Sequence, residues 1–366
     1  MMRRIACLAL AFASTLLPLN AQEKAGYADY VKGAVEGYIR PETRAFANAA
    51  KRLPTAVEDA CKSPGTETAD EFRVAYGVAV AAFGRISFLR YGPLAEESRL
   101  ERIAFLPDAR GVAQRQIRKL VAERDESATV PESLAAKSVA VQGLTALQLA
   151  AFDDNGQVTL GGTDEAGVYA CAYAQALAVN LAQLSGEVAA LWEAPDGFSG
   201  QLEAAGPDNQ RFRSSKEAAE TLFNALVTGL VIVRDQDVIP AFGPALGNDP
   251  ASAKPNRIPF SRANFGQAYI GSELTGIRDF IRASNYAKGV DSEGEWIAAS
   301  LEFEVSNSLR ALARAGEPMR ETVKTPEGYK ALSDMLISLK GLRDLVALNL
   351  AGSLNMTGGF NALDGD

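Results

Sequence analysis

The chain has 366 residues, of which 37 are lysine or arginine, 45 are aspartate or glutamate and none is histidine. The absence of histidine excludes the nucleophilic systems that use imidazole as a base, and it excludes the usual histidine-containing zinc sites. The formal net charge of −8 argues against nucleic acid as a partner, because phosphate binding needs a basic face.

The first residues are typical of an export signal. Arg3 and Arg4 precede an apolar run from residue 5 to residue 17, and Ala21 is a small residue at a plausible cleavage point. We therefore expect residues 1–21 to be a signal peptide and the mature protein to be periplasmic. The apolar run is shorter than the roughly 20 residues that span a bilayer, and no later run reaches that length. No membrane span is expected after signal removal.

Apolar residues recur at helical spacing along most of the chain. In the first half, the spacing predicts helices over residues 27–39, 42–60, 72–83, 134–147 and 169–192, with Pro41 ending or kinking the first of them. In the second half, it predicts helices over residues 218–238, 265–283, 293–315 and 326–350. No alternating polar and apolar run is long enough for a sheet, so the predicted fold class is all-α.

The chain divides at a polar, glycine-rich stretch, residues 196–208. We expect an N-terminal helical bundle over residues 22–195 and a C-terminal helical bundle over residues 209–366. Each half contains a Gly-Pro segment (92–94 and 243–246) followed by Arg-Ile-x-Phe (102–105 and 257–260), and then by further helices. This shared order predicts two similar bundles related by internal duplication, and a chance match is the alternative.

Two cysteines, Cys61 and Cys171, remain after removal of the predicted signal peptide. In an exported protein an even pair is more typical of a disulfide than of a metal site, and two sulfurs without histidine make a poor zinc site. We predict that they form a disulfide. Closing a loop of about 110 residues would stabilise the fold by about 4 kcal/mol in the chain-entropy model.

Several short segments resemble a known family in their order and spacing. They are Arg-Tyr-Gly-Pro-Leu at residues 90–94, Arg-Ile-Ala-Phe-Leu-Pro-Asp-Ala-Arg-Gly at 102–111, Val-Ala-Val-Gln-Gly-Leu-Thr-Ala-Leu-Gln at 139–148 and Phe-Asp at 152–153. Across most of the mature chain, this series resembles the imelysin family of bacterial envelope proteins. The resemblance implies two helical bundles related by duplication and an exported location. It also implies a link, which several members of the family have, to iron uptake or to a proposed metallopeptidase activity.

The signature of that family is Gly-x-His-x-x-Glu. Gly143 matches it, but Thr145 stands in place of the histidine and Gln148 stands in place of the glutamate. Positions i and i+3 share a helix face, so a His/Glu pair can hold one cation, whereas a hydroxyl and an amide bind transition metals poorly. Thr145 and Gln148 can still hydrogen-bond a polar ligand. The alternative is that they are packed polar residues at a helix interface.

Four charged residues near the repeated segments are further candidates for lining a cleft between the bundles: Arg102, Asp108, Arg257 and Arg262. The alternative for them is helix capping and surface ion pairing, which contributes little to stability. With Gly143, Thr145 and Gln148 they complete the predicted ligand-binding set. No catalytic residue, metal ligand or cofactor is predicted.

These observations favour an exported imelysin-like protein that binds a small polar ligand or an envelope protein in the periplasm, without catalysis and with a link to iron uptake. The alternative is a metallopeptidase with a carboxylate metal site, because carboxylates can hold iron or manganese without histidine. An acidic pair at helical spacing on facing helices would favour that alternative, and the sequence offers no convincing one. A third possibility is a structural envelope protein without a small ligand.

Overall fold

The computed structural model describes residues 25–245 and 249–357. The predicted signal peptide lies outside these residues. In the described part the chain consists of helices and connecting loops, and its β-contact is an isolated antiparallel bridge between Phe152 and Val158. The prediction of an all-α fold is confirmed. None of the described helices has an apolar stretch long enough to cross a bilayer.

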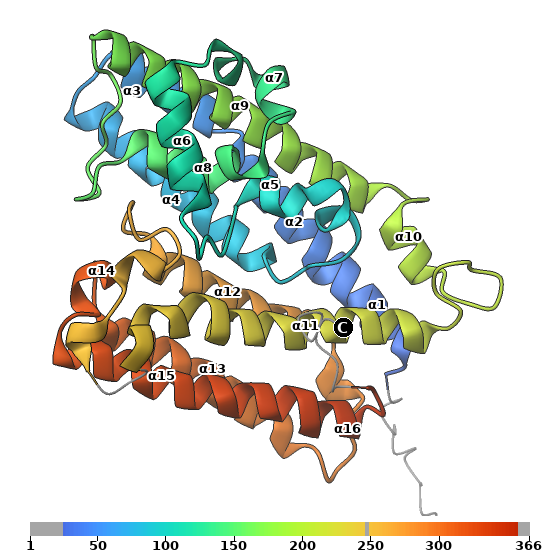
Figure 1. Ribbon diagram of the computed structural model, residues 1–366. Helices are drawn as coiled ribbons and strands as arrows, with labels where there is room; N and C mark the ends of the chain where they lie inside the picture. The colour runs from blue at the N-terminus through green and yellow to red at the C-terminus, as the bar shows by residue number, and fades with distance from the viewer. Residues whose placement is uncertain (1–24, 246–248, 358–366) are drawn as a thin grey trace, which may run out of the picture.

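The helices of the first half pack together (Figure 1, blue to green), with short 3₁₀ or π segments written as η. Their bounds are α1 Tyr27–Ala34, η1 Val35–Ile39, α2 Arg40–Ala50, α3 Leu53–Lys62, α4 Thr66–Ile86, η2 Gly92–Leu94, η3 Glu96–Ser98, α5 Arg99–Ile103, α6 Val112–Glu123, η4 Glu126–Thr129, α7 Pro131–Ala135, η5 Val139–Val141, α8 Gly143–Ala151, α9 Glu165–Glu193 and α10 Phe198–Glu203. Helices α2 and α3 each pack against both α4 and α9, and α8 lies against α9.

The second half forms the lower layer of the molecule (Figure 1, yellow to red). Its elements are α11 Ser215–Ile232, η6 Val233–Val238, η7 Ile239–Ala245, η8 Pro250–Ser252, η9 Pro255–Arg257, α12 Gly266–Ala283, η10 Tyr286–Lys288, α13 Trp296–Ala315, α14 Met319–Thr322, α15 Pro326–Asp344, η11 Leu345–Leu350 and α16 Ala351–Ser353. Helices α11, α12, α13 and α15 form the bundle of this half.

The first helical stretch does not end at Pro41. The chain stays helical from Tyr27 to Ala50, and the π segment η1 lies immediately before this proline. Proline has no N–H, and its ring presses on the carbonyl four residues earlier, so the wider π turn accommodates it. The break falls instead at Lys51 and Arg52, before α3.

The single helix predicted over residues 134–147 is wrong, because this stretch folds as α7, η5 and α8. Ser138 Oγ accepts the Ala140 N–H at 3.4 Å and so caps η5. Gly143 then adopts a φ of +67°, a left-handed conformation that favours glycine and interrupts a right-handed helix. The apolar residues at helical spacing therefore belong to three separate segments, and not to one helix.

The two halves meet along α4 and α12, and α1 packs against α11 (Figure 1). Glycines allow the backbones to come close: a Cβ atom on Gly84 would lie 2.9 Å from Tyr269 O, and one on Gly276 would lie 2.8 Å from Arg85 O. Across the same interface, Arg85 Nη2 of α4 pairs with Asp279 Oδ2 of α12 at 3.0 Å. The halves therefore share one closely packed interface.

The repeated Gly-Pro segments have a local feature in common. Gly92 and Gly243 both have positive φ, +55° and +64°, and both lie in short 3₁₀ segments, η2 and η7. This similarity is compatible with duplication. The duplication itself, and the boundaries of the two bundles at residues 195 and 209, remain predictions.

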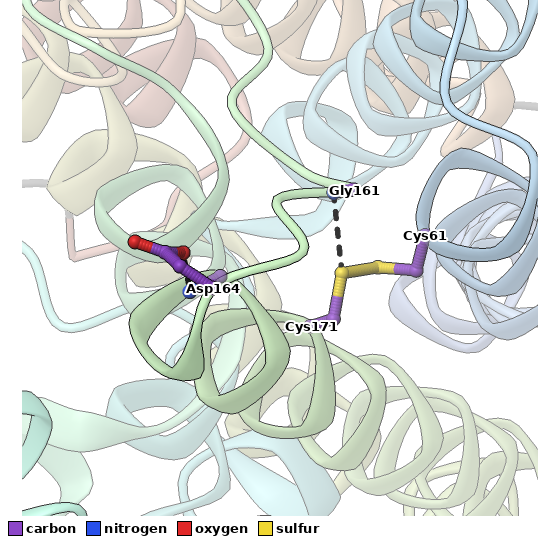
Figure 2. The surroundings of a disulfide bond; sticks show 5 residues. Cys61, Gly161, Asp164 and Cys171 are labelled. Carbon is purple, nitrogen blue, oxygen red and sulfur yellow. Dashed lines mark hydrogen bonds between the residues drawn. A yellow bond between two sulfur atoms is a disulfide. The ribbon is translucent and has the colours of Figure 1, made fainter.

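The predicted disulfide is confirmed. Cys61, near the end of α3, is bonded to Cys171 in α9, 110 residues later, with an Sγ–Sγ distance of 2.04 Å. The Gly161 N–H donates to Cys171 Sγ at 3.3 Å (Figure 2). Gly161 has a φ of +91°, and a Cβ atom there would lie 2.4 Å from Pro64 Cβ. The disulfide thus joins α3 to α9 beneath the loop that precedes α9.

Candidate functional site

A cavity of about 400 Å³ lies between the two halves, which is within the usual range for a small-molecule site. Both segments that follow the repeated Gly-Pro motifs contribute to its wall, through residues 106–109 and 256–262. Of the predicted ligand-binding residues, five line this cavity: Asp108, Thr145, Gln148, Arg257 and Arg262. Gly143 and Arg102 lie outside its lining.

Gly143 and Arg102 instead position the start of α8. A Cβ atom on Gly143 would lie 2.3 Å from Arg102 O, so the positive φ and the close backbone approach both require glycine here. Arg102 Nε donates to the side chain of Gln142 at 3.4 Å. Gln142 is fully buried, and its Nε2 also donates to Lys137 O at 2.7 Å. The glycine of the family signature therefore fixes where α8 begins.

Thr145 and Gln148 are one helical turn apart on α8, and both line the cavity. Thr145 is 4% exposed and Gln148 is 7% exposed. Within the described chain, neither Thr145 Oγ1 nor Gln148 Oε1 has a hydrogen-bond partner. Buried polar atoms nearly always have a partner, so unpartnered oxygens beside a cavity indicate a place where a ligand or water donates.

Asp108 has a structural role in addition to its place in the wall. Its carboxylate accepts the backbone N–H groups of Val112 at 2.7 Å and Ala113 at 2.9 Å. These are the first residues of α6, where donors lack intrahelical partners and negative charge is favourable. Capping, the alternative considered from the sequence, accounts for this side chain.

The arginines of the wall join the two halves. Arg262 Nε donates to Phe152 O at 2.6 Å, and its Nη1 pairs with Asp154 Oδ1 at 2.6 Å. Arg257 Nη1 donates to Ala109 O, and Arg320 Nη1, from α14, donates to Asp154 O. All three cations therefore hold backbone carbonyls of the first half across the edge of the cavity.

Sequence reasoning missed the contribution of η6. Asp235, Gln236 and Asp237 are consecutive, and all three line the cavity. They lie in a π-helical segment at the end of α11, and such segments are common at functional sites. Two acids and an amide at the end of an otherwise apolar helix were the available signal. Among the described residues, Gln236 Oε1 and Asp237 Oδ2 receive no N–H or hydroxyl hydrogen bond.

We call Thr145, Gln148, Gln236 and Asp237 the acceptor cluster, because each has an unpartnered buried oxygen at the same cavity. Asp237 is 3% exposed and is paired with Glu273 of α12, which is 2% exposed. Two carboxyls can form such a pair only when they share a proton. Because Asp237 lines the cavity and Glu273 lies behind it on α12, one member of this titratable pair forms part of the cavity wall.

Burial raises the pKa of Asp237 to about 7, and the opposing effects of nearby Arg90 and of the hydrogen bond from Glu273 reduce the rise. Burial, followed by the charge of Asp237, raises the pKa of Glu273 well above its usual value, although Ser87 donates to Glu273 Oε1 at 3.0 Å. The proton therefore belongs mainly to Glu273, and Asp237 carries the negative charge.

The residues at the signature positions do not fit a transition metal. Thr145 and Gln148 supply a neutral hydroxyl and a neutral amide, where metal ions of this kind prefer imidazole, thiolate or carboxylate. In the described residues, no three or more His, Cys, Asp or Glu side chains gather closely enough to hold a metal ion. The arrangement can hydrogen-bond a polar molecule, and no chemical step through a metal follows from it.

This fold also occurs among solved structures. One is an imelysin-like protein from Psychrobacter arcticum 273-4, with a TM-score of 0.74 and 18% identity, over 91% of this chain and 97% of that one. Another, from Parabacteroides distasonis ATCC 8503, is named as an iron-regulated protein A precursor and has a TM-score of 0.65 and 12% identity, over 90% and 98% of the two chains. At these identities the likeness shows the fold alone.

Sequence comparison gives the family. A search of curated proteins finds no match. The family model of peptidase M75, imelysin, matches residues 34–346, which include α8, the acceptor cluster and both repeated segments. Because this match covers most of the chain, the protein belongs to the imelysin family.

Proposed function

We propose that this protein is an exported, non-catalytic binding protein that holds a small polar ligand in the cavity between its two halves. The observation that carries the proposal is the acceptor cluster, in which the buried oxygens of Thr145, Gln148 and Gln236 lack a donor within the described chain and lie at the same cavity as the Asp237 carboxylate. An unpaired buried acceptor costs about 1–3 kcal/mol. A ligand that donates to several of these oxygens would recover that free energy on binding.

A periplasmic location and a link to iron belong to the same proposal. The basic and apolar pattern of residues 1–21 supports export, and the Cys61–Cys171 disulfide suits an oxidising compartment. The support for iron is the name of the Parabacteroides distasonis protein, together with what the family resemblance implies. Thr145 and Gln148 make a direct metal role at the signature positions a poor fit.

A metallopeptidase with a carboxylate site is the alternative, and one observation favours it. Asp237 and Glu273 are buried carboxyls on facing helical segments, although each helix supplies only one of them. A carboxyl that binds a metal must be ionised, whereas the pKa of Glu273 is held well above its usual value by burial. The positive charge of Arg90 also faces Asp237. A binding site without catalysis therefore fits Asp237, Glu273 and Arg90 better than a metallopeptidase site does.

A thermal-shift screen of the purified protein against metal ions and small polar compounds tests the proposal. A compound present at a hundred times its Kd stabilises the native state by about 2.7 kcal/mol, which raises the Tm measurably. We expect at least one polar compound to raise the Tm of the wild type and to lose that effect in Thr145→Val and in Gln148→Leu. Compounds that shift all variants equally would contradict the proposed site.

Gln175→Leu is the matched control. Gln175 lies on α9, its Oε1 is also buried without a partner in the described chain, and it does not line the cavity. Gln175→Leu removes the same kind of side chain as Gln148→Leu, but this variant should still bind the ligand. Proteolysis that chelators abolish, and that Gln148→Ala also abolishes, would instead establish the metallopeptidase alternative.

A further inference from the structure

The chemistry of the acceptor cluster specifies the ligand further. Resting on the proposed binding function, we propose that the ligand carries a primary ammonium group, and that this group binds Asp237 together with the unpartnered oxygens of Thr145, Gln148 and Gln236. The buried carboxylate would supply the charge interaction, and the three neutral oxygens would supply hydrogen-bond acceptors.

Hydrogen-bonding capacity is the first argument. The unpartnered atoms of the cluster are a carboxylate oxygen, two amide oxygens and a hydroxyl oxygen. An ammonium group has three N–H donors and no acceptor, so it complements such a set. A carboxylate or phosphate ligand could accept from the Thr145 hydroxyl and from the glutamine amides, but it would place its negative charge against the Asp237 carboxylate. A neutral hydroxyl compound offers one donor per hydroxyl and leaves most of these oxygens unpaired.

The charge distribution around the cavity is the second argument. Asp237 is the anion of the cluster and is 3% exposed, so an opposite charge in the cavity would be only weakly screened. The arginines of the wall, which would attract an anionic ligand, already donate to backbone oxygens of Ala109, Phe152 and Asp154, although the buried Nε of Arg320 has no hydrogen-bond partner in the described chain. An anionic ligand would have to compete with these contacts, whereas a singly charged ammonium group would share Asp237 with Arg90.

Ammonium binding should depend on pH, because the groups that face Asp237 affect whether its carboxyl is protonated. These groups are Glu273 and Tyr269 on α12, and Arg90 in the segment after α4. With a pKa of about 7, Asp237 is mostly protonated at pH 6 and mostly ionised at pH 8. An aliphatic ammonium group keeps its proton over this range. Binding should therefore become about tenfold tighter between pH 6 and pH 8, with release of a proton.

Isothermal titration calorimetry with four probes of equal chain length tests the inference. The probes are 1,4-diaminobutane, 4-aminobutanoate, 1,4-butanediol and succinate. We expect heat of binding from one or both ammonium probes, and at least tenfold weaker binding of butanediol and succinate. Binding of diaminobutane alone would identify a simple amine, and binding of both ammonium probes would identify a ligand class that includes zwitterions.

Asp237→Asn keeps the shape of the side chain and removes its charge. We expect this variant to lose at least tenfold in affinity for the ammonium probes and to lose the pH dependence. Asp334→Asn, on α15 and away from the cavity, should retain both. Unchanged ammonium binding in Asp237→Asn would overturn the inference, because the charge partner would then lie elsewhere.

Failure of this inference can be told apart from failure of the proposed function. Tighter binding of succinate or butanediol than of the ammonium probes would overturn the ammonium assignment but leave a cavity that binds polar ligands. The ammonium assignment would also be overturned if neither ammonium probe gave heat at 10 mM. It would be overturned as well if calcium chloride gave heat of binding that depends on Asp237. Binding that is unaffected by Gln148→Leu would contradict the site itself.

Discussion

Gly143 lies so close to Ile103 that a Cβ atom on the glycine would be 2.1 Å from the Ile103 carbonyl oxygen. Gly143 also has a φ of +67°. We therefore expect Gly143→Ala to destabilise the protein by about 2 kcal/mol or more, because strain and a steric clash add together. Urea unfolding followed by circular dichroism measures this loss.

Gly186 provides the control for that substitution. It lies inside α9, and a Cβ atom there would meet no atom within 4 Å. Gly186→Ala should stabilise the protein by up to about 1 kcal/mol, because alanine is the better helix former. Equal effects of the two substitutions would show that the start of α8 is not constrained as described.

The disulfide gives a second prediction. Alkylation of the unfolded, unreduced protein should modify neither Cys61 nor Cys171, as read by peptide mass mapping. The double variant Cys61→Ser, Cys171→Ser should lose about 4 kcal/mol of unfolding free energy, because the unfolded chain regains the freedom of a long loop. Labelling of both cysteines without reductant would contradict the bond between α3 and α9.

Asp237 should make stability depend on pH. Its pKa rises from an unfolded value near 3.9 to about 7, so the folded state binds the proton more tightly. This stabilisation is complete below about pH 4 and is lost as the pH rises through 7. Compared with the wild type, Asp237→Asn should be more stable at pH 8 by at least about 1.4 kcal/mol, the equivalent of one pKa unit. The difference should shrink toward pH 5.

Urea unfolding of both proteins at pH 5, 6, 7 and 8 measures that difference. Asp334→Asn, on the surface of α15, should follow the wild type at every pH. Parallel stability curves for Asp237→Asn and the wild type would mean that Asp237 is not held in a buried, proton-sharing pair.

Restoring the family signature should create a metal ligand pair. Gln148→Glu alone should bind zinc weakly, because one carboxylate lacks a partner ligand. The double variant Thr145→His, Gln148→Glu places an imidazole and a carboxylate one turn apart on α8 and should bind zinc more tightly than either single variant. Zinc titration by calorimetry measures this. Equal affinities in wild type and double variant would show that α8 does not present these positions together.

Apolar periodicity was sufficient to predict the long helices, and the two cysteines that remain after the predicted signal peptide were sufficient to predict the disulfide. Periodicity failed over residues 134–147, where apolar spacing resembled one helix although Ser138 and Gly143 interrupt it. At Pro41, where the sequence predicted an end or a kink, the helix does not end, because a π turn accommodates the proline. Both outcomes depend on backbone conformation, which apolar spacing does not encode.

The candidate site was predicted in part. Thr145 and Gln148 were found from the family signature, and the structure places both at the cavity. Asp237 and Glu273 were not found, because they lie 36 positions apart and meet only when α12 packs beside η6. Arg102 was proposed for the ligand but contacts Gln142. Charge near a motif does not reveal whether a side chain faces a cavity or a backbone carbonyl.

Native mass spectrometry of the protein purified directly from cells under native conditions tests the central claim, that the cavity holds a polar ligand. We expect the wild type and Gln175→Leu to carry a bound organic molecule, and the variant Thr145→Val, Gln148→Leu to lack it. Identical spectra for the wild type and the double variant, whether both carry a ligand or neither does, would contradict the claim.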